Sequence, residues 1–482
     1  MSLSRRRFFE DSLLATAAAL AAGPVSGVLA EDKQSTSAGE KLSVACVGVR
    51  GRGGSHLGAF AGRSDTEVTY VCDVDEKVVN SRADGVKSRQ GKRPKTTKDM
   101  REIFEDKSVD IVSFATPNHW HALGAIWALQ AGKDVYVEKP VSHNVSEGRR
   151  IVEAARKYKR ICQCGTQSRS NPGMQEGIAF IQAGKIGRVD LARGLCYKRR
   201  GSIGARGEYE VPAEVDYDLW SGPAEVLPLT RPRLHYDWHW QWPYGNGDLG
   251  NQGIHQMDIA RWGLGVSDIG NSVQSYGGRF GYEDAGTTAN TQVTIHGYGE
   301  KRIVFEVRGL ETGAYRGSKV GVIFQGTEGY FVSPNYNGGT AFDPDGKVIK
   351  KFDKGSDGYH YANFLKAVRS RKVEDLNADI LDGHLSSAMC HLGNISYRLG
   401  ESLTADAAKE RLASDREAAE TFNRFVEHLE GNKVAVANTK IGFGEKLKVD
   451  PAKETIADNS RATAMLTREY RKGFEVPEAG KV

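Results

Sequence analysis

Short apolar runs alternate with longer amphipathic segments from residue 42 to about residue 165. The apolar runs are rich in β-branched residues and have the length of buried strands. The predicted strands cover residues 42–49, 67–72, 109–115, 135–137 and 161–165, and the clearest predicted helices cover 119–131 and 146–158. Strands that alternate with helices in this way predict an α/β fold with a doubly wound parallel sheet.

A different pattern begins near residue 187, where strand-like runs follow one another and many end at Gly, Asn or Asp turns. These runs cover 188–198, 272–280, 291–298, 302–309 and 320–332, and helices are predicted over 360–371 and 379–399. The stretch 401–482 is charged and partly helical, notably over 415–430. We therefore expect a first α/β domain at 41–165, a second domain at 166–400 and a charged C-terminal extension at 401–482.

The first thirty residues do not follow either pattern. Ser4-Arg5-Arg6-Arg7-Phe8-Phe9 matches a twin-arginine export signal, and a moderately apolar stretch and a small-residue cleavage site ending at Ala30 follow it. A chance basic start before an Ala-rich helix is the alternative. The signal predicts cleavage after Ala30, a polar linker over 31–40, the twin-arginine export machinery as a partner, and a periplasmic or otherwise exported protein.

Composition narrows the function classes. The 482 residues are 39% apolar, enough for real cores, and carry a net charge of +5 with scattered Lys and Arg. A dedicated nucleic-acid surface is therefore not expected, and no apolar run is long enough to predict a membrane span. The six cysteines are interpreted as small core residues, because a protein exported after folding would fold with reduced thiols.

A glycine-rich turn follows the first predicted strand. Gly48 and Gly53 occupy the first and sixth positions of a dinucleotide-binding fingerprint, but Arg50 occupies the third. Gly51 can let the backbone approach a pyrophosphate instead, and the following helix N-terminus offers free N–H groups. Arg50 or Arg52 can add a positive charge. The position of the turn between a strand and a helix supports this interpretation.

Asp73 ends the second predicted strand, 25 residues after Gly48. This is close to the spacing of a carboxylate that accepts hydrogen bonds from the adenosine ribose. An acid there repels a 2′-phosphate, so NAD is favoured over NADP. The alternative for Asp73 is a helix N-cap, a role that Asp75 can also fill.

Polar residues follow two further strands at their carboxyl ends, where ligands bind in open α/β sheets. Thr116-Pro117-Asn118-His119 follows one strand, and Glu138-Lys139-Pro140 follows the other. Lys139 can donate to a substrate hydroxyl, although a solvated Lys before a loop is the ordinary alternative. His119 and His121 lack a third ligand, so no metal site is predicted, and one of them is expected to cap a helix.

The segment 236–244, Tyr-Asp-Trp-His-Trp-Gln-Trp-Pro-Tyr, contains five aromatic residues. Aromatic faces interleaved with polar groups suit the C–H faces and hydroxyls of sugars, with Trp238 and Trp240 as candidates. A packed interface between domains or subunits explains the segment almost as well.

Taken together, these motifs resemble the Gfo/Idh/MocA family, named after glucose–fructose oxidoreductase, inositol dehydrogenase and a rhizopine catabolism protein. The matching segments are the glycine turn, Asp73, Thr116–His119, Glu138–Pro140 and Gly250–Asp258. The resemblance runs from about residue 42 to about residue 400. It implies a Rossmann domain that binds NAD, followed by an α/β domain whose open, mainly antiparallel sheet covers the active site. It also implies cofactor contacts from Thr116–His119, Glu138 and Lys139.

The resemblance implies catalytic roles for two residues: Lys139 contacts the substrate hydroxyl, and His255 is the general acid/base. A hydride leaving a carbinol carbon requires the oxygen to lose a proton, and a His with a pKa near ~6.5 suits that transfer. Many family members carry Asp where this chain has Asn251. Asn251 can orient a substrate hydroxyl but cannot relay a proton, and Asp248 and Asp258 are the two candidates to compensate.

The sequence therefore predicts an exported NAD(P)-dependent oxidoreductase that acts on a carbohydrate, keeps its cofactor bound and forms a homo-oligomer. Oxidation of one sugar can be coupled to reduction of another. A redox-neutral epimerase, lyase or glycoside hydrolase that oxidises its substrate transiently is the main alternative. A non-catalytic sugar-binding protein is the alternative from another class.

Overall fold

The computed structural model describes residues 41–482, and the predicted export signal and linker lie outside these residues. Residues Leu42–Val482 form one compact unit. Its first sheet has six parallel strands in the order β3-β2-β1-β4-β5-β6, as the alternating pattern predicted. These strands are β1 (Leu42–Val47), β2 (Thr66–Cys72), β3 (Lys95–Thr97), β4 (Ile111–Phe114), β5 (Asp134–Val137) and β6 (Cys162–Cys164).

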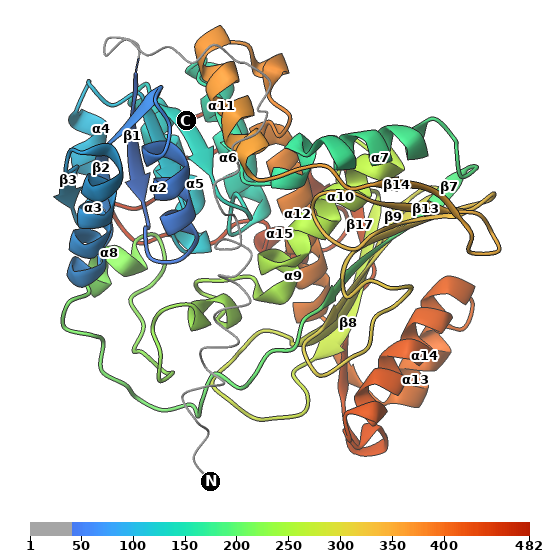
Figure 1. Cartoon of the computed structure of the whole chain (residues 1–482). Coiled ribbons are helices and arrows are strands. Elements are labelled where there is room, and N and C mark those ends of the chain that lie inside the picture. The colour runs from blue at the N-terminus through green and yellow to red at the C-terminus, as the bar shows by residue number, and fades with distance from the viewer. Residues whose placement is uncertain (1–40) are drawn as a thin grey trace. The chain divides into compact units, whose positions relative to one another are not determined.

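Helices cover both faces of this sheet (Figure 1). Successive side chains of a strand point to opposite faces, so the apolar run of β1 supplies two cores. Val44 and Cys46 pack with α2 (Arg52–Ala61), α3 (Glu76–Gln90) and α11 (Gly358–Ser370). Ala45 and Val47 pack on the other face with α4 (Arg101–Glu105), α5 (Asn118–Gln130) and α6 (Val145–Lys157). All six cysteines of the chain are buried free thiols.

The second sheet contains twelve strands and is antiparallel except where β7 pairs with β10. Its main path runs β14-β13-β12-β11-β7-β10-β9-β8-β16-β15, with β17 beside β8 and β18 beside β17. The strands are β7 (Val189–Tyr197), β8 (Ser272–Gly278), β9 (Thr291–Tyr298), β10 (Lys301–Arg308), β11 (Val320–Gly326), β12 (Tyr330–Ser333), β13 (Gly339–Phe342), β14 (Val348–Phe352), β15 (Glu401–Leu403), β16 (Ile441–Phe443), β17 (Leu447–Asp450) and β18 (Thr455–Ile456). One expectation was wrong here, because the single strand predicted over 320–332 is the hairpin of β11 and β12.

One face of this sheet packs against α7 (Pro172–Gln182), α10 (Gly253–Leu264) and α12 (Ile380–Arg398). The other face packs against α13 (Ala405–Leu412) and α14 (Arg416–Gly431) (Figure 1). The contact between them is an aromatic core that includes Tyr276, Phe422 and Phe425. Short helices α8 (Tyr217–Ser221) and α9 (Gly247–Asn251) lie in the long connection between β7 and β8, and α15 (Ser460–Ala464) follows β18.

Residues after 400 pack against both the first and the second domain. Strands β15 and β16 extend the second sheet. The final residues return to the first domain, where the ring centroid of Phe474 lies 5.6 Å from that of Trp120.

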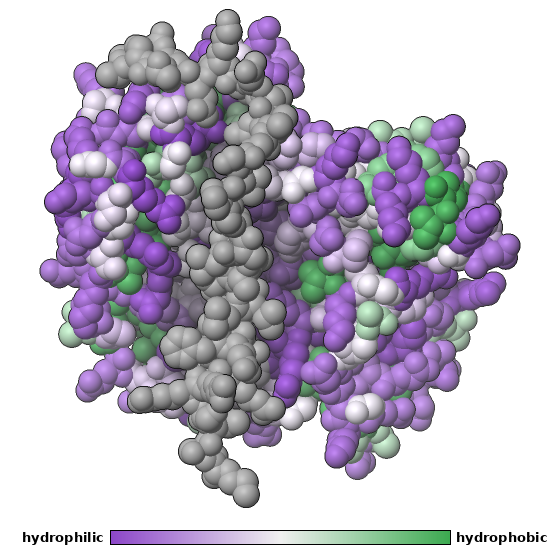
Figure 2. Space-filling view, viewed as in Figure 1, coloured by the Kyte–Doolittle hydropathy of each residue, from purple (hydrophilic) through white to green (hydrophobic). Residues whose placement is uncertain are grey.

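Figure 2 shows mostly hydrophilic residues on one face, with apolar residues gathered toward the side where β13 and β14 lie. Within residues 41–482, no helix combines the length and the apolar character that a bilayer span requires.

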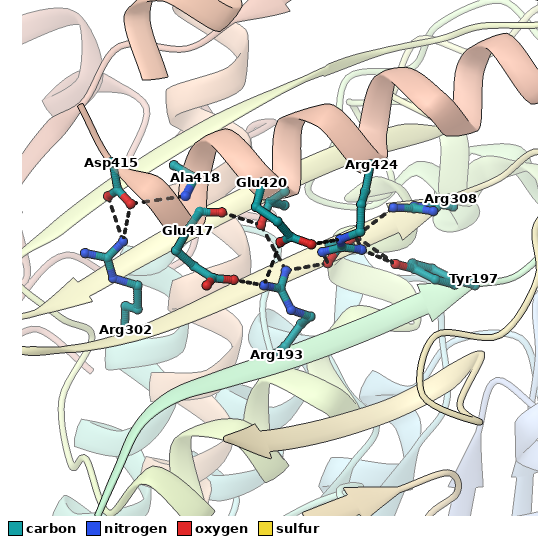
Figure 3. A network of polar contacts seen from close by, with 11 residues as sticks. Arg193, Tyr197, Arg302, Arg308, Asp415, Glu417, Ala418, Glu420 and Arg424 are labelled. Carbon is teal, nitrogen blue, oxygen red and sulfur yellow. Dashed lines mark hydrogen bonds and ion pairs between the residues drawn. The ribbon is translucent and has the colours of Figure 1, made fainter. Parts of the chain in front are cut away.

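A buried ionic network holds α14 on the second sheet (Figure 3). Glu306 of β10 is 1% exposed and accepts from Arg193 and Arg424, each at 2.6 Å, and from Arg308 at 3.1 Å. Burial would raise the pKa of Glu306, but the positive charges of Arg193 and Arg424 outweigh it and lower this pKa to about 2. Arg193 also pairs with Glu417 of α14. The network therefore ties β7, β10 and α14 together.

Candidate active site

Two glycines give the turn after β1 its shape. Gly48 has φ +77°, and a Cβ there would lie 2.7 Å from the backbone nitrogen of Thr116. A Cβ on Gly53 would lie 1.9 Å from the carbonyl oxygen of Gly48. Neither position tolerates a side chain. The N-terminus of α2 has no side-chain cap and no acid in its first turn, and a Cβ on Gly51 would meet no atom within 4 Å. This arrangement fits a pyrophosphate.

Asp73 lies beside this turn, as its spacing predicted. Its carboxylate accepts from the backbone nitrogen of Val49 at 2.8 Å and from that of Asp75 at 3.1 Å. Burial raises the pKa of Asp73. Asp75 caps α3 by accepting from two backbone nitrogens. Asp73 is therefore not the helix cap, and its place at the end of β2 fits the ribose of NAD.

The two arginines of the turn are both ion-paired. Arg50 donates to Asp75 at 3.0 Å. Arg52 donates to Glu138 at 2.9 Å and to Asp357 at 3.1 Å. Much of their charge is thus balanced by neighbouring carboxylates, so the glycine backbone remains the main candidate for contacts with phosphate.

Glu138 is the buried anion of the site. It accepts from Arg52 and lies 3.2 Å from Nε2 of His56, whose other ring nitrogen lies 2.8 Å from Ser113 Oγ. Burial would raise the pKa of Glu138, but the charge of Arg52 and the hydrogen bond from His56 hold it well below its usual range. Glu138 is therefore an ionised anchor that links α2 to the end of β5.

Lys139 connects the two domains and lines a cavity of about 560 Å³. Its Nζ donates to the backbone oxygen of Asn251 at 3.0 Å. Burial lowers the pKa of Lys139, although the charge of Glu138 opposes this shift. The ammonium group lies at the carboxyl end of β5, as predicted, and next to the segment that carries His255.

His255 lies on the same cavity wall from α10 and is 8% exposed. Its Nδ1 has no hydrogen-bond partner among the described residues. Burial first, and then the charge of Lys139, hold the pKa of His255 well below its usual value. The ring is therefore neutral at neutral pH and can accept a proton.

Most of the predicted site residues share this cavity. Its wall contains Gly48, Arg50, Gly51, Arg52, Asp73, Thr116, Pro117, Asn118, Glu138, Lys139, Trp238, Asn251 and His255. Gly53 shapes the turn from below without lining the cavity. His119 is buried behind the wall, with Nε2 at 2.9 Å from the carbonyl oxygen of Trp220. It holds the connection between β7 and β8 against α5.

Asp248, Asp258 and Trp240 lie away from the cavity. Asp248 is 1% exposed and forms two hydrogen bonds with Arg200, at 2.7 and 2.8 Å. Asp258 forms an ion pair with Arg169 at 2.8 Å. Trp240 is 4% exposed and packs with Ile203 and Ala285. The geometry therefore supports neither carboxylate as a substitute base and gives Trp240 a packing role.

Several residues of the cavity were not predicted. They are Gln167, His235, His239, Gln252, Tyr336 and Asp357. The Tyr336 ring centroid lies 4.7 Å from that of His255, and Gln252 donates to its hydroxyl. Tyr336 comes from the loop between β12 and β13, and no motif around it indicates a site.

Two family models match the chain, one to each domain. Residues 42–166 match the oxidoreductase family with an NAD-binding Rossmann fold, GFO_IDH_MocA. Residues 204–429 match the C-terminal α/β domain of the same oxidoreductase family. Together the matched ranges span most of the chain. The first family model names NAD, the cofactor that the glycine turn and Asp73 fit.

Curated relatives match about a quarter to a third of the chain. Inositol 2-dehydrogenase of Salmonella typhimurium strain LT2 is 30% identical over 176 residues, which are 36% of this chain and 50% of the relative. Alpha-N-acetylgalactosaminidase of Shewanella oneidensis strain MR-1 is 33% identical over 129 residues, 26% of this chain and 28% of the relative. The chain thus spans half or less of the length of these relatives.

A solved structure extends the likeness to both domains. The WlbA dehydrogenase from Bordetella pertussis, in complex with NADH and UDP-GlcNAcA, aligns with a TM-score of 0.54 at 20% identity. The alignment covers 72% of this chain and 94% of that one. At this identity the likeness shows the two-domain fold.

Proposed function

Because the chain belongs to the Gfo/Idh/MocA family of oxidoreductases, by both of its domains, we propose that it is an NAD-dependent enzyme acting on a sugar or sugar derivative. The reaction would transfer a hydride to or from a hydroxyl carbon. One observation carries this proposal: the glycine turn and Asp73 share a single cavity wall with Lys139 and His255. When bound, NAD supplies the hydride acceptor or donor of the reaction.

The residues of the chain would handle the proton and the oxygen. A substrate hydroxyl beside Lys139 would receive a hydrogen bond from Nζ, and the ammonium charge would stabilise the alkoxide as it develops. His255 would take the proton, because its ring is neutral and lines the same cavity as Lys139. Asn251 would orient the substrate, with Trp238 against the sugar face.

A single-turnover measurement tests this function. The purified protein would be mixed with NAD and a panel of sugars, and absorbance of reduced nicotinamide would be followed with Lys139→Ala as the comparison. Oxidation of at least one sugar, lost in Lys139→Ala, is expected. Binding of sugars with no hydride transfer in either direction would favour a non-catalytic sugar-binding protein.

We further propose that the protein is exported already folded and keeps its NAD bound through successive turnovers. The support is the Ser4–Phe9 motif, together with the cleavage pattern ending at Ala30. Arg5→Lys combined with Arg6→Lys should leave the protein in the cytoplasm, because the exporter reads that pair. Fractionation of cells expressing each form checks this, and unchanged export of the double variant would refute it.

A redox-neutral reaction is the second candidate. Two observations favour it: Asn251 replaces the Asp of many family members, and one relative is an alpha-N-acetylgalactosaminidase. Transient oxidation at one carbon would then permit cleavage of a glycosidic bond, with the hydride returned at the end. Release of 4-nitrophenol from 4-nitrophenyl glycosides without net NADH formation would identify this reaction, whereas stoichiometric NADH would exclude it.

A further inference from the structure

A second cavity, of about 790 Å³, lies apart from the first and shares no lining residue with it. Its wall combines the loop before α6, the end of the aromatic segment, the last turns of α12 and residues 464–471. Residues 464–471 lie beyond residue 429, where the match to the family ends. The cavity is therefore built partly from a portion of the chain that the family model does not include.

Two arginines of this cavity have no carboxylate partner among the described residues. The side chain of Arg398 in α12 forms neither an ion pair nor a hydrogen bond within residues 41–482, and its guanidinium lies 5.0 Å from the ring centroid of Trp242. Arg468 donates to the carbonyl oxygen of Pro243 at 2.9 Å and contacts His143 Nδ1 at 3.1 Å. Both guanidinium groups keep N–H groups available for a ligand.

Two histidines also belong to the wall of the cavity. His143 Nδ1 accepts from Arg468, so the neutral ring carries its proton on Nε2, which has no partner within the described chain. His391 is 3% exposed, and its Nδ1 is likewise unpartnered in that part of the chain. Both nitrogens are buried, so the donors that a ligand in the cavity can reach are those of the two arginines.

The remaining polar groups of the wall are already satisfied or exposed. Asn394 donates to the backbone oxygen of Asn246 and accepts from Gln292. The carboxylates of Glu225 and Glu469 are exposed, and neither pairs with an arginine among residues 41–482. The charged groups of the wall without an ion-pair partner among residues 41–482 are therefore the two cationic arginines, which are donors, and these two exposed carboxylates.

We propose that this cavity binds an organic anion, with a carboxylate or phosphate on Arg398 and Arg468 and a sugar ring against Trp242 and Pro243. A planar guanidinium forms paired hydrogen bonds with either kind of oxyanion. The indole face of Trp242 suits the C–H face of a sugar. An acidic sugar or a sugar phosphate combines both features, whereas a neutral sugar lacks the oxyanion. This site is independent of the proposed redox function.

Calorimetric titration of the full protein tests the proposal with three probes at pH 7: D-glucuronate, D-glucose 6-phosphate and D-glucose. At least one anionic probe should bind more tightly than D-glucose, and the tighter of the two identifies the oxyanion. Arg398→Gln and Arg468→Gln should each weaken that probe by about 10- to 100-fold, the range for loss of a charge-assisted hydrogen bond. Arg416→Gln, an exposed arginine outside both cavities, should leave the affinity unchanged.

Lys139→Ala assigns the binding to one cavity or the other, because it removes the lysine of the first cavity. The anionic probe should bind this variant as it binds the unaltered protein. Thermal melting of each arginine variant checks that the fold is intact, and Arg398 is exposed, so its substitution is not expected to unfold the protein. Equal binding of D-glucose, or affinities that neither arginine variant changes, would overturn the proposal.

Discussion

Glu138 and Glu306 are both buried glutamates held by arginines, yet they lie in different surroundings. Glu138, 4% exposed, lines the first cavity with Arg52 and His56 beside it. Glu306, 1% exposed, is closed in under α14 with Arg193 and Arg424. Arginine charges hold both pKa values low. Burial and ion pairing therefore do not distinguish a site from a structural anchor, whereas access to a cavity does.

The largest expected effect is on turnover, and it tests the role of His255 in the first cavity. His255→Ala should lower turnover by roughly 10²–10⁴-fold, the usual range for loss of a general base. Bound NAD should remain, because the ring of His255 is not among the groups that fit its phosphates or ribose. Stopped-flow hydride transfer measures the loss. His428→Ala, on α14 and outside both cavities, is the control, and near-normal transfer in His255→Ala would remove this residue from the mechanism.

Substitutions of Glu138 and Glu306 should differ in whether they lower turnover as well as stability. Removing one partner of a buried ion pair costs roughly 3–5 kcal/mol, so Glu138→Gln and Glu306→Gln should both lower the free energy of unfolding. Only Glu138→Gln should also lower turnover at temperatures where the protein is folded. Urea unfolding and initial rates measure the two quantities. A Glu306→Gln variant that is equally inactive while folded would contradict this distinction.

Protonation of Glu306 at acid pH should weaken the buried ionic network around it. The pKa of Glu306 is about 2 in the folded chain and about 4.5 in an unfolded one. Its stabilising contribution, roughly 3 kcal/mol, is present above pH 4.5 and is lost as the pH falls toward 2. The difference in unfolding free energy between the unaltered protein and Glu306→Gln should therefore shrink between pH 5 and pH 3. A constant difference across that range would argue against an ionised Glu306.

The smallest expected effect concerns the cofactor. Asp73→Ala should weaken NAD binding by about tenfold, close to the value of one hydrogen bond to a charged group. Discrimination against NADP should relax, since the repelling carboxylate is gone. Fluorescence titration with both cofactors measures this, with Asp84→Ala on the exposed side of α3 as the control. Tighter NADP than NAD binding by the unaltered protein would refute the assignment.

The first domain and its half of the site could be predicted from the order of the residues alone. Its signals are local: the period of apolar residues, and glycines where a Cβ would collide, as at Gly48 and Gly53. Because parallel strands all end at one edge, Asp73, Thr116 and Lys139 had to meet once the strands were identified. The family resemblance added His255, whose role no local pattern indicates.

The distant side chains that complete each site became evident from the folded chain and not from any sequence pattern. Tyr336 reaches His255 from a loop between two strands, and Arg200 engages Asp248 across 48 residues. The second cavity joins Arg398 to Arg468 and Trp242 in the same way. Such contacts depend on how sheets and helices pack, and packing is set by many small contributions over the whole core rather than by any one segment.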